Sequence, residues 1–325
     1  MKDLKYNYVV FGTCDDYYRV SYDELNKYDN VKLVMDYIDS SSYLLKQIFR
    51  IHTSLAINNK ITLPFKNIWN QKAFINTFSD NKPICFVFFS RNQLCNPQFI
   101  DYLKNTYPKC KCVAFWQDLV DKINVPEMEL LLSEKLDLAL SFDHADAVKY
   151  SLTYYPLVYS PYLIHDSEKY KSDVYFVGKA KDRLSVILGA YEKFKEAGLK
   201  CDFNITGVAK KNQKYRDDIN YCSGLAYIEN LKHIKGTKCM LEVMQGGGTG
   251  YTLRYAEAIM YNKKIITNNT MIKDASFYNP RLISTFSDVK DIDVLFPLCD
   301  IQNINYCCKE SLYPSRMLEF IDETL

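Results

Sequence analysis

The chain has 325 residues, of which 48% are hydrophobic and 25% are charged. These shares are typical of globular proteins and exclude a disordered tail, a collagen-like repeat and a coiled coil, while the length predicts about two domains. Lys and Arg number 41 against 39 Asp and Glu, and this net charge of only +2 predicts that nucleic acid is not a partner.

Short apolar runs alternate with amphipathic stretches in the first half of the chain. The runs predict strands at Tyr8–Phe11, Val31–Met35, Ile84–Phe89, Cys112–Phe115 and Leu136–Ser141. The amphipathic stretches predict helices at about Ser41–Asn58, Pro97–Tyr107 and about Ala145–Tyr150. Near-continuous apolar strands separated by helices are typical of a parallel sheet that is covered on both faces.

The alternation restarts after a segment rich in Pro, Tyr and Ser, between residues 155 and 172, which is the best candidate for a linker. The strands predicted beyond it are Val174–Val177, Phe203–Thr206, Cys239–Met244 and Lys264–Thr267. The helices predicted there are about Arg183–Ala197, about Thr252–Tyr261 and Ser315–Thr324. The sequence therefore predicts an α/β fold of two halves joined near residue 165, followed by a last helix.

The eleven cysteines form no CxxC pair and the chain has only four histidines, so their spacing supports no zinc site. Most of these cysteines stand in apolar runs, where we expect free thiols in a reducing compartment. The first residues lack the features of a secretory signal, and the longest clean apolar run, Ile84–Phe89, is far below the ~20 residues that span a bilayer. We therefore expect a soluble cytoplasmic protein.

The sharpest local motif is LEVMQGGGTGYT, from Leu241 to Thr252, which leads from a predicted strand through four glycines into a predicted helix. Glycines let a backbone approach a ligand closely, and a helix N-terminus favours an anion. The segment is therefore suited to a phosphate or diphosphate. Its spacing is neither the GxGxxG of dinucleotide-binding proteins nor a P-loop, and a loop without a ligand is the alternative.

On the helix that follows, Arg254 and Glu257 lie three residues apart and share a face. Arg254 is a candidate to contact phosphate, and Glu257 is a candidate to accept hydrogen bonds from ribose hydroxyls. The alternative is a surface ion pair, which contributes less than ~1 kcal/mol. The glycine loop just before the pair favours the functional interpretation.

A second basic loop follows the predicted strand Val174–Val177. Gly178 ends that strand, and Lys179, Lys181 and Arg183 surround the start of the next helix. Three cations at a helix N-terminus oppose the helix dipole, and an anionic ligand between them would remove the conflict. A solvated charged turn is the alternative.

The stretch from Asp173 to Asn279 resembles the nucleotide-sugar-binding half of glycosyltransferases of the GT-B fold, which have two facing Rossmann-like domains. The matching pieces are FVGKAKDR, TLRYAEAIMYNKKIITNN and the last helix. Within them, Glu257–Met260 and Lys264–Thr267 look like the helix–strand element of that fold. In the first half, SFDHADAVKY and YYPLVYS are similar to bacterial capsular and lipopolysaccharide glycosyltransferases.

The resemblance implies an acceptor-binding domain at residues 1–165, a donor-binding domain at 166–305, a cleft between them, and a helix at 306–325 that returns toward the first domain. It implies donor contacts at Gly178, Lys181, Arg183, Gly248, Thr249, Gly250, Thr252 and Glu257. Many retaining members carry a further Glu eight positions before the ribose carboxylate. Thr249 stands there in this sequence, which favours inverting transfer.

An inverting transferase needs one general base to deprotonate the acceptor hydroxyl. Asp15 and Asp16 follow the first predicted strand, and Asp118 follows Cys112–Phe115. All three are catalytic candidates, because ligands of parallel sheets bind beyond the carboxyl ends of the strands. A loop or cap carboxylate is the alternative for each.

Other polar and aromatic residues carry weaker signals. Asp291-Ile292-Asp293 spells an acidic triplet that binds metal in a different transferase fold, but it stands isolated near the C-terminus. We therefore expect no metal, and no cofactor besides the nucleotide-diphosphate sugar as co-substrate. Tyr221 and Tyr227 are candidates to line a base pocket, and His144 and His165 are weaker candidates for the general base.

The leading hypothesis is transfer of a sugar from a nucleotide-diphosphate donor to a capsule or lipopolysaccharide glycan, free or lipid-linked. A lipid-linked acceptor leaves open a peripheral contact with the inner face of the cytoplasmic membrane. The alternatives are a nucleotide-sugar epimerase on the same plan and a catalytically silent nucleotide-sugar-binding partner in a glycan-assembly complex. An oxidoreductase is disfavoured because no GxGxxG follows the first strand.

Overall fold

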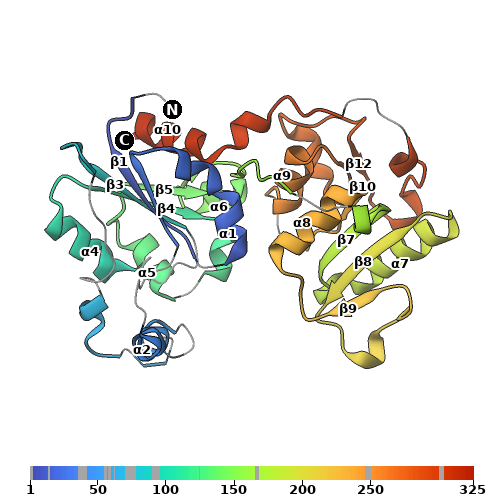
Figure 1. The fold of residues 1–325 in the computed structure, drawn as a ribbon, viewed down its shortest axis with the longest axis horizontal. Helices are drawn as coiled ribbons and strands as arrows, with labels where there is room; N and C mark the ends of the chain where they lie inside the picture. The colour runs from blue at the N-terminus through green and yellow to red at the C-terminus, as the bar shows by residue number, and fades with distance from the viewer. Residues whose placement is uncertain are drawn as a thin grey trace. The chain divides into compact units, whose positions relative to one another are not determined.

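The chain forms two compact units, which are described here one at a time (Figure 1). The computed structural model describes residues 3–13, 15–35, 42–54, 57, 60–61, 63–69, 78–89, 96–123, 125–164, 168–245, 250–299 and 304–325. The first unit consists of Met1–Val158 together with Tyr313–Leu325, and the second unit is Tyr159–Leu312. The boundaries therefore follow residues 158 and 312, whereas the sequence places them after residues 165 and 305.

The first unit contains a six-stranded parallel sheet with the strand order β2-β1-β3-β4-β5-β6. Its strands are β1 (Asn7–Phe11), β2 (Val31–Val34), β3 (Ile84–Phe89), β4 (Lys111–Trp116), β5 (Leu138–Ser141) and β6 (Thr153–Tyr154). Its helices are α1 (Asp16–Ser21), α2 (Tyr43–Thr53), α4 (Pro97–Thr106), α5 (Val125–Leu132), α6 (His144–Lys149) and α10 (Pro314–Thr324).

Both faces of the first sheet are buried, which explains why its strands are nearly all apolar. Along β1, Tyr8 and Val10 point into one hydrophobic core, which also contains Met317 of α10. The alternating residues Val9 and Phe11 point into a second core on the other face. The side chains of these four β1 residues are fully buried.

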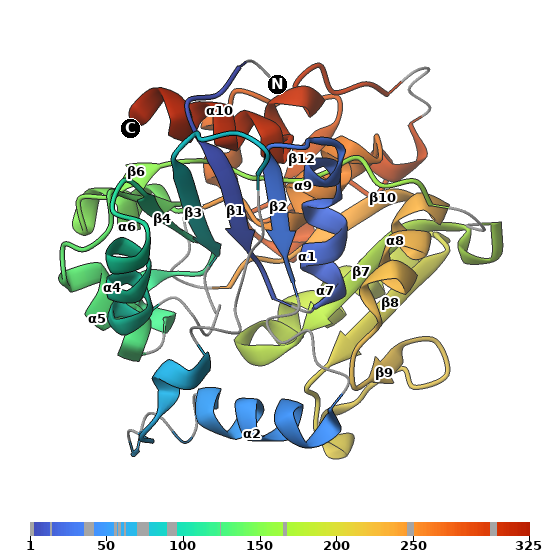
Figure 2. The same cartoon turned by 60° about the vertical axis from the view of Figure 1, so that its left-hand side comes forward.

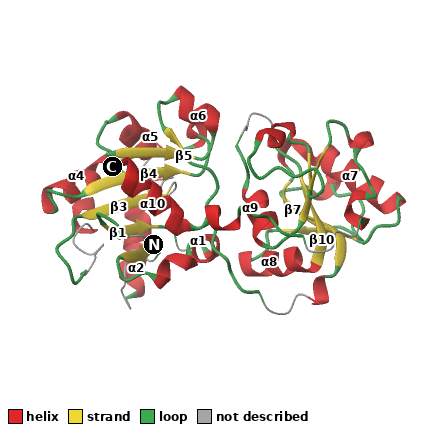
Figure 3. Ribbon diagram, turned by 90° about the horizontal axis from the view of Figure 1, so that it is seen from above, coloured by secondary structure: helices red, strands yellow, loops and turns green. Residues whose placement is uncertain are grey.

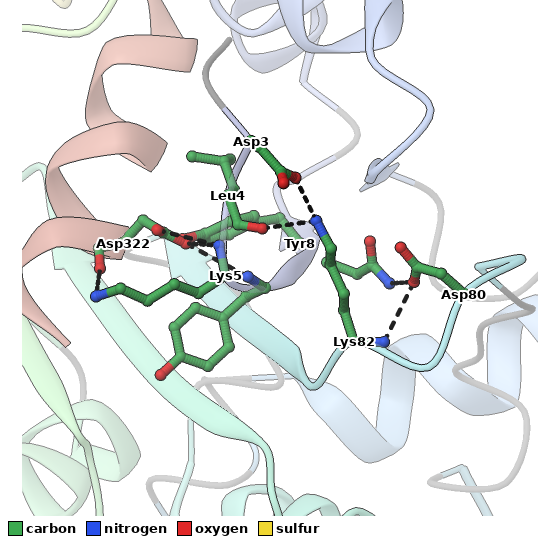
Figure 4. A network of polar contacts seen from close by, with 9 residues as sticks. Asp3, Leu4, Lys5, Tyr8, Asp80, Lys82 and Asp322 are labelled. Carbon is green, nitrogen blue, oxygen red and sulfur yellow. Dashed lines mark hydrogen bonds and ion pairs between the residues drawn. The ribbon is translucent and has the colours of Figure 1, made fainter.

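Helix α10 belongs to the first unit because carboxylates fix both of its ends. Glu24 accepts hydrogen bonds from the backbone N–H of Ser315 at 3.1 Å and from its hydroxyl at 2.9 Å. At the other end, Asp322 Oδ1 accepts from the backbone N–H of Lys5 at 2.9 Å and from the Tyr8 hydroxyl at 3.0 Å (Figure 4). The last helix of the chain thus closes the core around its first strand.

The second unit repeats the plan with the strand order β12-β11-β10-β7-β8-β9, again with every pair parallel. The strands are β7 (Ser172–Lys179), β8 (Cys201–Thr206), β9 (Asn220–Cys222), β10 (Thr237–Glu242), β11 (Lys264–Thr267) and β12 (Ile283–Thr285). The helices are α7 (Leu184–Glu196), α8 (Tyr227–Gly236) and α9 (Leu253–Met260). Helices α7 and α8 cover opposite faces of the sheet (Figure 3).

All nine strands predicted from apolar runs are present, and each predicted helix overlaps an observed one. The end of α7 follows the prediction closely: Gly198 comes directly after the helix with φ +79°, a conformation that strains any residue with a side chain. The elements that the sequence analysis did not specify are α1, α5, α8, β6, β9 and β12. Four of these are six residues or shorter, too short for a periodic pattern.

The structure bears on two further expectations within its described residues. The nine cysteines in those residues are free thiols. No helix in the described part of the chain has both the length and the apolar character needed to cross a bilayer. The two parallel sheets with their flanking helices confirm the predicted α/β fold.

Candidate functional site

Three polar segments meet at the carboxyl edge of the second sheet. The strands β11, β10 and β7 are neighbours and run parallel, so the loops that follow them share one edge. Gly178 lies near the end of β7, Glu242 ends β10, and Thr267 ends β11. Both basic-glycine loops that the sequence singles out therefore start at this edge.

Arg183 connects the first two of these loops. Its Nε and Nη2 donate to the carbonyl oxygen of Lys179 at 3.3 and 2.9 Å, and its Nη1 donates to the carbonyl oxygen of Val243, just after β10. Burial lowers the pKa of the Arg183 guanidinium, against the opposing charge of Glu242. Arg183 therefore carries a partly desolvated positive charge.

The charge of Arg183 has no carboxylate in hydrogen-bond contact among the residues that the structure describes. Arg254 of α9 lies close enough for charge repulsion to contribute to the lowered pKa of Arg183. Lys181 adds a third cation and donates from Nζ to Gln245 Oε1 at 2.8 Å. Its φ of 47° is unusual for a residue with a side chain. Since a desolvated charge is unfavourable unless it is paired, this group of cations is suited to an anion.

Glu242, which the sequence analysis does not single out, ties the two ends of the glycine loop together. It is almost fully buried at the end of β10. Thr252, the N-cap residue of α9, donates its hydroxyl to Glu242 Oε1, and Thr267 donates to Oε2 at 2.7 Å. Tyr255 in turn donates to Thr267 Oγ1 at 3.0 Å. The signal in the sequence is a lone carboxylate at the end of an otherwise apolar strand.

Burial raises the pKa of Glu242, which predicts a pH-dependent stability. The folded state holds this proton to a higher pH than the unfolded chain does. The stability that protonated Glu242 contributes to the folded state is therefore fully present below the ordinary glutamate pKa of about 4.3. It is lost as the pH rises through the raised pKa of Glu242 in the folded state. We expect wild type to lose stability relative to Glu242→Gln across this window, as measured by urea denaturation of both proteins at a series of pH values.

Glu229 provides the matched control for this pH experiment. The hydrogen bond from Tyr170 lowers the pKa of Glu229, so its contribution is lost as the pH falls through the lowered folded pKa. Wild type should therefore lose stability relative to Glu229→Gln only toward acid pH, the opposite sign. Parallel stability curves for wild type and Glu242→Gln would show that Glu242 does not titrate as a buried acid.

Arg254 and Glu257 form an ion pair in the structure, but it is buried. Arg254 Nη1 donates to Glu257 Oε2, and Nη2 donates to the carbonyl oxygen of Val177 at 3.3 Å. The Glu257 side chain is 0% exposed and that of Arg254 is 23% exposed. Burial lowers the pKa of Arg254, but the charge of Glu257 outweighs it and raises the pKa above its ordinary value. The alternative of a surface ion pair is therefore wrong.

The other carboxylate oxygen of Glu257 is also engaged. Oε1 accepts from the Tyr227 hydroxyl at 2.9 Å and from Asn230 Nδ2 at 3.2 Å, both from α8. The Tyr227 hydroxyl also bonds that of Tyr159 at 2.7 Å, and Tyr175 donates to Asn230 Oδ1 at 2.8 Å. Glu257 thus holds Arg254 and Tyr227 in place, and Arg254 is the more exposed member of the ion pair.

The remaining predicted donor residues differ in what the structure says of them. Gly178 is half-buried, and a Cβ there would lie 3.6 Å from Arg183 Nη2, at ordinary van der Waals distance. Gly250 is buried, two residues before the N-cap residue Thr252 of α9. Gly248 and Thr249 lie outside the described residues, so the centre of the glycine loop stays a prediction.

The tyrosines proposed for a base pocket are not brought together. Tyr221 lies on the edge strand β9 and donates to the carbonyl oxygen of Lys214 at 2.6 Å. Tyr227 begins α8 and belongs to the Glu257 network instead. The two tyrosines are only six residues apart in the sequence, but Tyr221 lies on a strand and Tyr227 lies on a helix, and each makes different contacts.

The catalytic candidates of the first unit lie at the carboxyl edge of its own sheet. Asp15 is the N-cap residue of α1 and accepts from the Thr13 hydroxyl at 3.0 Å, and Asp16 is exposed in the first turn of that helix. Asp118 follows β4 and accepts from the backbone N–H of Leu119 at 3.1 Å. Their strands β1 and β4 are separated only by β3.

The weaker candidates add no second site. His144 begins α6 and packs edge-on against Tyr154, while His165 lies outside the described residues. Asp293 caps a turn by accepting from the backbone N–H of Leu295 at 2.9 Å. In the described ranges, no three His, Cys, Asp or Glu side chains are grouped so that they could hold a metal ion.

No protein-family model and no curated protein sequence matches the chain. Its fold is similar to that of a Listeria monocytogenes protein assigned as a UDP-N-acetylglucosamine 2-epimerase, with 8% identity, a TM-score of 0.51 and coverage of 98% of this chain and 96% of the other. An alpha-glucosyltransferase in complex with UDP-glucose and DNA has 10% identity, a TM-score of 0.48 and coverage of 97% and 90%. The glycotransferase of kitacinnamycin has 8% identity, a TM-score of 0.46 and coverage of 98% and 99%.

At these identities the likeness shows the fold alone. It confirms two Rossmann-like domains on the GT-B plan, in agreement with the two parallel sheets. The prediction that excluded nucleic acid as a partner is wrong, because one of the similar structures is a complex with DNA. The physical reason is that net charge averages over the whole surface, whereas phosphates are contacted by local groups of cations.

Proposed function

We propose that this protein is a glycosyltransferase that moves a sugar from a nucleotide-diphosphate donor to a capsule or lipopolysaccharide glycan at the inner face of the cytoplasmic membrane. The observation that carries the proposal is the partly desolvated guanidinium of Arg183, whose described hydrogen bonds go only to carbonyl oxygens. An anion bound there would neutralise a charge that has no carboxylate in hydrogen-bond contact within the described part of the chain.

The proposed donor diphosphate lies against the loops after β7 and β10. Arg183 and Lys181 come from the first loop and Arg254 from the helix after the second. Arginine presents several N–H groups in one plane, which matches the oxygens of a phosphate. In this arrangement Glu257 positions Arg254 and Tyr227 from behind and stays a candidate for the ribose hydroxyls.

The proposed reaction is an inverting displacement. The bond between the anomeric carbon and the diphosphate oxygen breaks as the acceptor oxygen bonds to the opposite face of that carbon. The acceptor proton passes to a carboxylate of the first unit, with Asp15, Asp16 and Asp118 as the candidates. The cations of the second unit stabilise the negative charge that develops on the leaving diphosphate.

A thermal-shift panel of nucleoside mono- and diphosphates and nucleotide sugars tests the donor site. Binding to the folded state alone raises the melting temperature, so we expect diphosphates to raise it more than monophosphates. The base that gives the largest shift names the donor nucleotide. A panel in which no nucleotide changes the melting temperature would contradict the proposal.

The epimerase alternative is kept because the fold likeness to a protein assigned as a UDP-N-acetylglucosamine 2-epimerase covers almost the whole chain. Incubation with donor alone distinguishes the two. An epimerase returns an isomeric nucleotide sugar without an acceptor, whereas a transferase releases nucleoside diphosphate and needs an acceptor for full turnover. Binding without either product would favour a silent nucleotide-sugar-binding partner.

A further inference from the structure

Cys307 and Cys308 are the only two cysteines of the chain that are adjacent in the sequence. Both are free thiols in a turn just before the short 3-10 helix Lys309–Leu312. Cys307 is exposed and Cys308 is half-buried. The other closely spaced pair, Cys110 and Cys112, is 8% and 0% exposed. The turn therefore offers two neighbouring sulfur atoms that a small solute can reach.

The two thiols of this turn are not equivalent. Burial raises the pKa of Cys308, and the charge of Cys307 acts in the same direction, so the two sulfur atoms lie close enough to interact. The charge of Lys309 opposes this rise of the pKa. The exposed Cys307 is therefore the thiol that meets a solute first, and Cys308 is the thiol placed to react with Cys307.

Hydrogen bonds fix the chain on both sides of the turn. Before it, the buried Tyr306 donates its hydroxyl to the carbonyl oxygen of Lys263 at 3.0 Å. After it, the carbonyl oxygen of the buried Leu312 accepts from the backbone N–H of Tyr159 at 2.7 Å. Tyr159 and Leu312 are the first and last residues of the second unit. Helix α10, which follows Leu312, packs against β1 of the first unit (Figure 2).

A disulfide between adjacent residues is strained. Consecutive Cα atoms lie about 3.8 Å apart across a trans peptide bond, whereas ordinary disulfides join Cα atoms about 4.4–6.8 Å apart. The ring closed by such a bond also restricts the backbone torsions between the two residues. Strained and exposed disulfides are reduced easily, so a bond between Cys307 and Cys308 would be reversible rather than structural.

We propose that Cys307 and Cys308 form a reversible dithiol site that a low-molecular-weight disulfide, such as glutathione disulfide, oxidises. The Cys307 thiolate attacks one sulfur of the glutathione disulfide, whose S–S bond breaks and releases one glutathione. Cys308 then attacks the Cys307 sulfur of the mixed disulfide and releases the second glutathione. The two cysteines lose two electrons and two protons, which the two glutathione thiols carry away.

Ring closure changes the segment that connects the second unit to α10. The carbonyl oxygen of Cys308 accepts from the backbone N–H of Ser311 at 3.1 Å and from its hydroxyl at 2.6 Å. Leu312 comes directly after Ser311, so a turned Cys308 carbonyl strains the hydrogen bond between Leu312 and Tyr159. We therefore expect oxidation to loosen the place where the chain enters and leaves the second unit. No residue proposed to bind the donor takes part, so this inference and the proposed function fail separately.

Mass spectrometry of the full chain, treated with glutathione disulfide and without nucleotide, tests the site. Trypsin cleaves after Lys290 and Lys309, so one peptide contains Cys299, Cys307 and Cys308. We expect this peptide to lose two hydrogen atoms on oxidation and to regain them with dithiothreitol. The matched control Cys299→Ser should behave like wild type, because it removes the third cysteine of the peptide and keeps the pair.

Single variants separate ring closure from simple modification of a thiol. Cys308→Ser should keep one glutathione at Cys307, because the mixed disulfide has no second thiol to attack it. Cys307→Ser should react more slowly, because its remaining thiol is half-buried. In oxidised wild type the amide of Tyr159 should exchange its hydrogen about fivefold faster than in the reduced protein, as expected for one weakened hydrogen bond. Cys308→Ser treated in the same way should show no such change.

Three results would overturn the inference. One is a wild-type peptide that does not react or that only carries glutathione. Another is a disulfide that contains Cys299 in place of one member of the pair. The third is exchange at the Tyr159 amide that is the same in the oxidised and reduced proteins, which would show that ring closure does not reach the ends of the second unit.

Discussion

Replacing Arg183 by Ala is expected to weaken the binding of a nucleoside diphosphate by about 2–4 kcal/mol, or roughly thirty- to seven-hundredfold in Kd. The guanidinium donates to the carbonyl oxygens of Lys179 and Val243 and is held between the two loops with part of its water removed. A charge prepared in this way interacts strongly with a diphosphate. Isothermal titration calorimetry at two salt concentrations measures the loss.

Arg216 provides the matched control for Arg183. It lies in the same unit and also donates to a backbone carbonyl oxygen, that of Lys210, but it is exposed. Arg216→Ala should leave nucleotide affinity unchanged, and Arg183→Lys should be intermediate because it keeps the charge and loses the planar fork. Unchanged nucleotide affinity in Arg183→Ala would contradict the role of Arg183 in binding the diphosphate, on which the proposed function rests.

Replacing Glu257 by Ala is expected to lower the free energy of unfolding by about 3–5 kcal/mol, because it leaves the largely buried guanidinium of Arg254 without its counter-charge. Tyr227 and Asn230 lose an acceptor at the same time. The melting temperature should fall by on the order of 10 °C. Thermal unfolding followed by circular dichroism measures this.

Arg316 and Glu319 on α10 provide the control, since they form an ion pair at the same spacing with the Arg316 side chain 50% exposed. Glu319→Ala should lower stability by less than about 1 kcal/mol. The double variant Arg254→Met/Glu257→Leu should regain much of the stability lost in Glu257→Ala, since apolar residues replace a buried ion pair. It should not regain nucleotide affinity; recovered affinity would show that Arg254 does not contact the ligand.

The sequence predicts the α/β fold because buried parallel strands are continuous apolar runs, which can be recognised without knowing which strands pair with them. Ile84–Phe89 was predicted with the bounds that the structure has, and Gly198 was placed correctly at the end of α7. The short strands β6, β9 and β12 follow from pairing with a neighbour rather than from their own two or three residues. Their sequences hold too little information to reveal them.

The same distinction applies to the candidate site. The sequence by itself determined the cations and glycines of the two loops, because they stand in contiguous motifs between a strand and a helix. Only the tertiary structure decided that Glu242 joins Thr252 and Thr267, and that Glu257 is buried behind Arg254 rather than exposed on a helix face. Both facts arise because parallel strands bring distant loops to one edge of the sheet, where the carboxylates of Glu242 and Glu257 become buried. The spacing of neighbouring residues in the sequence predicts neither the meeting of the loops nor the burial.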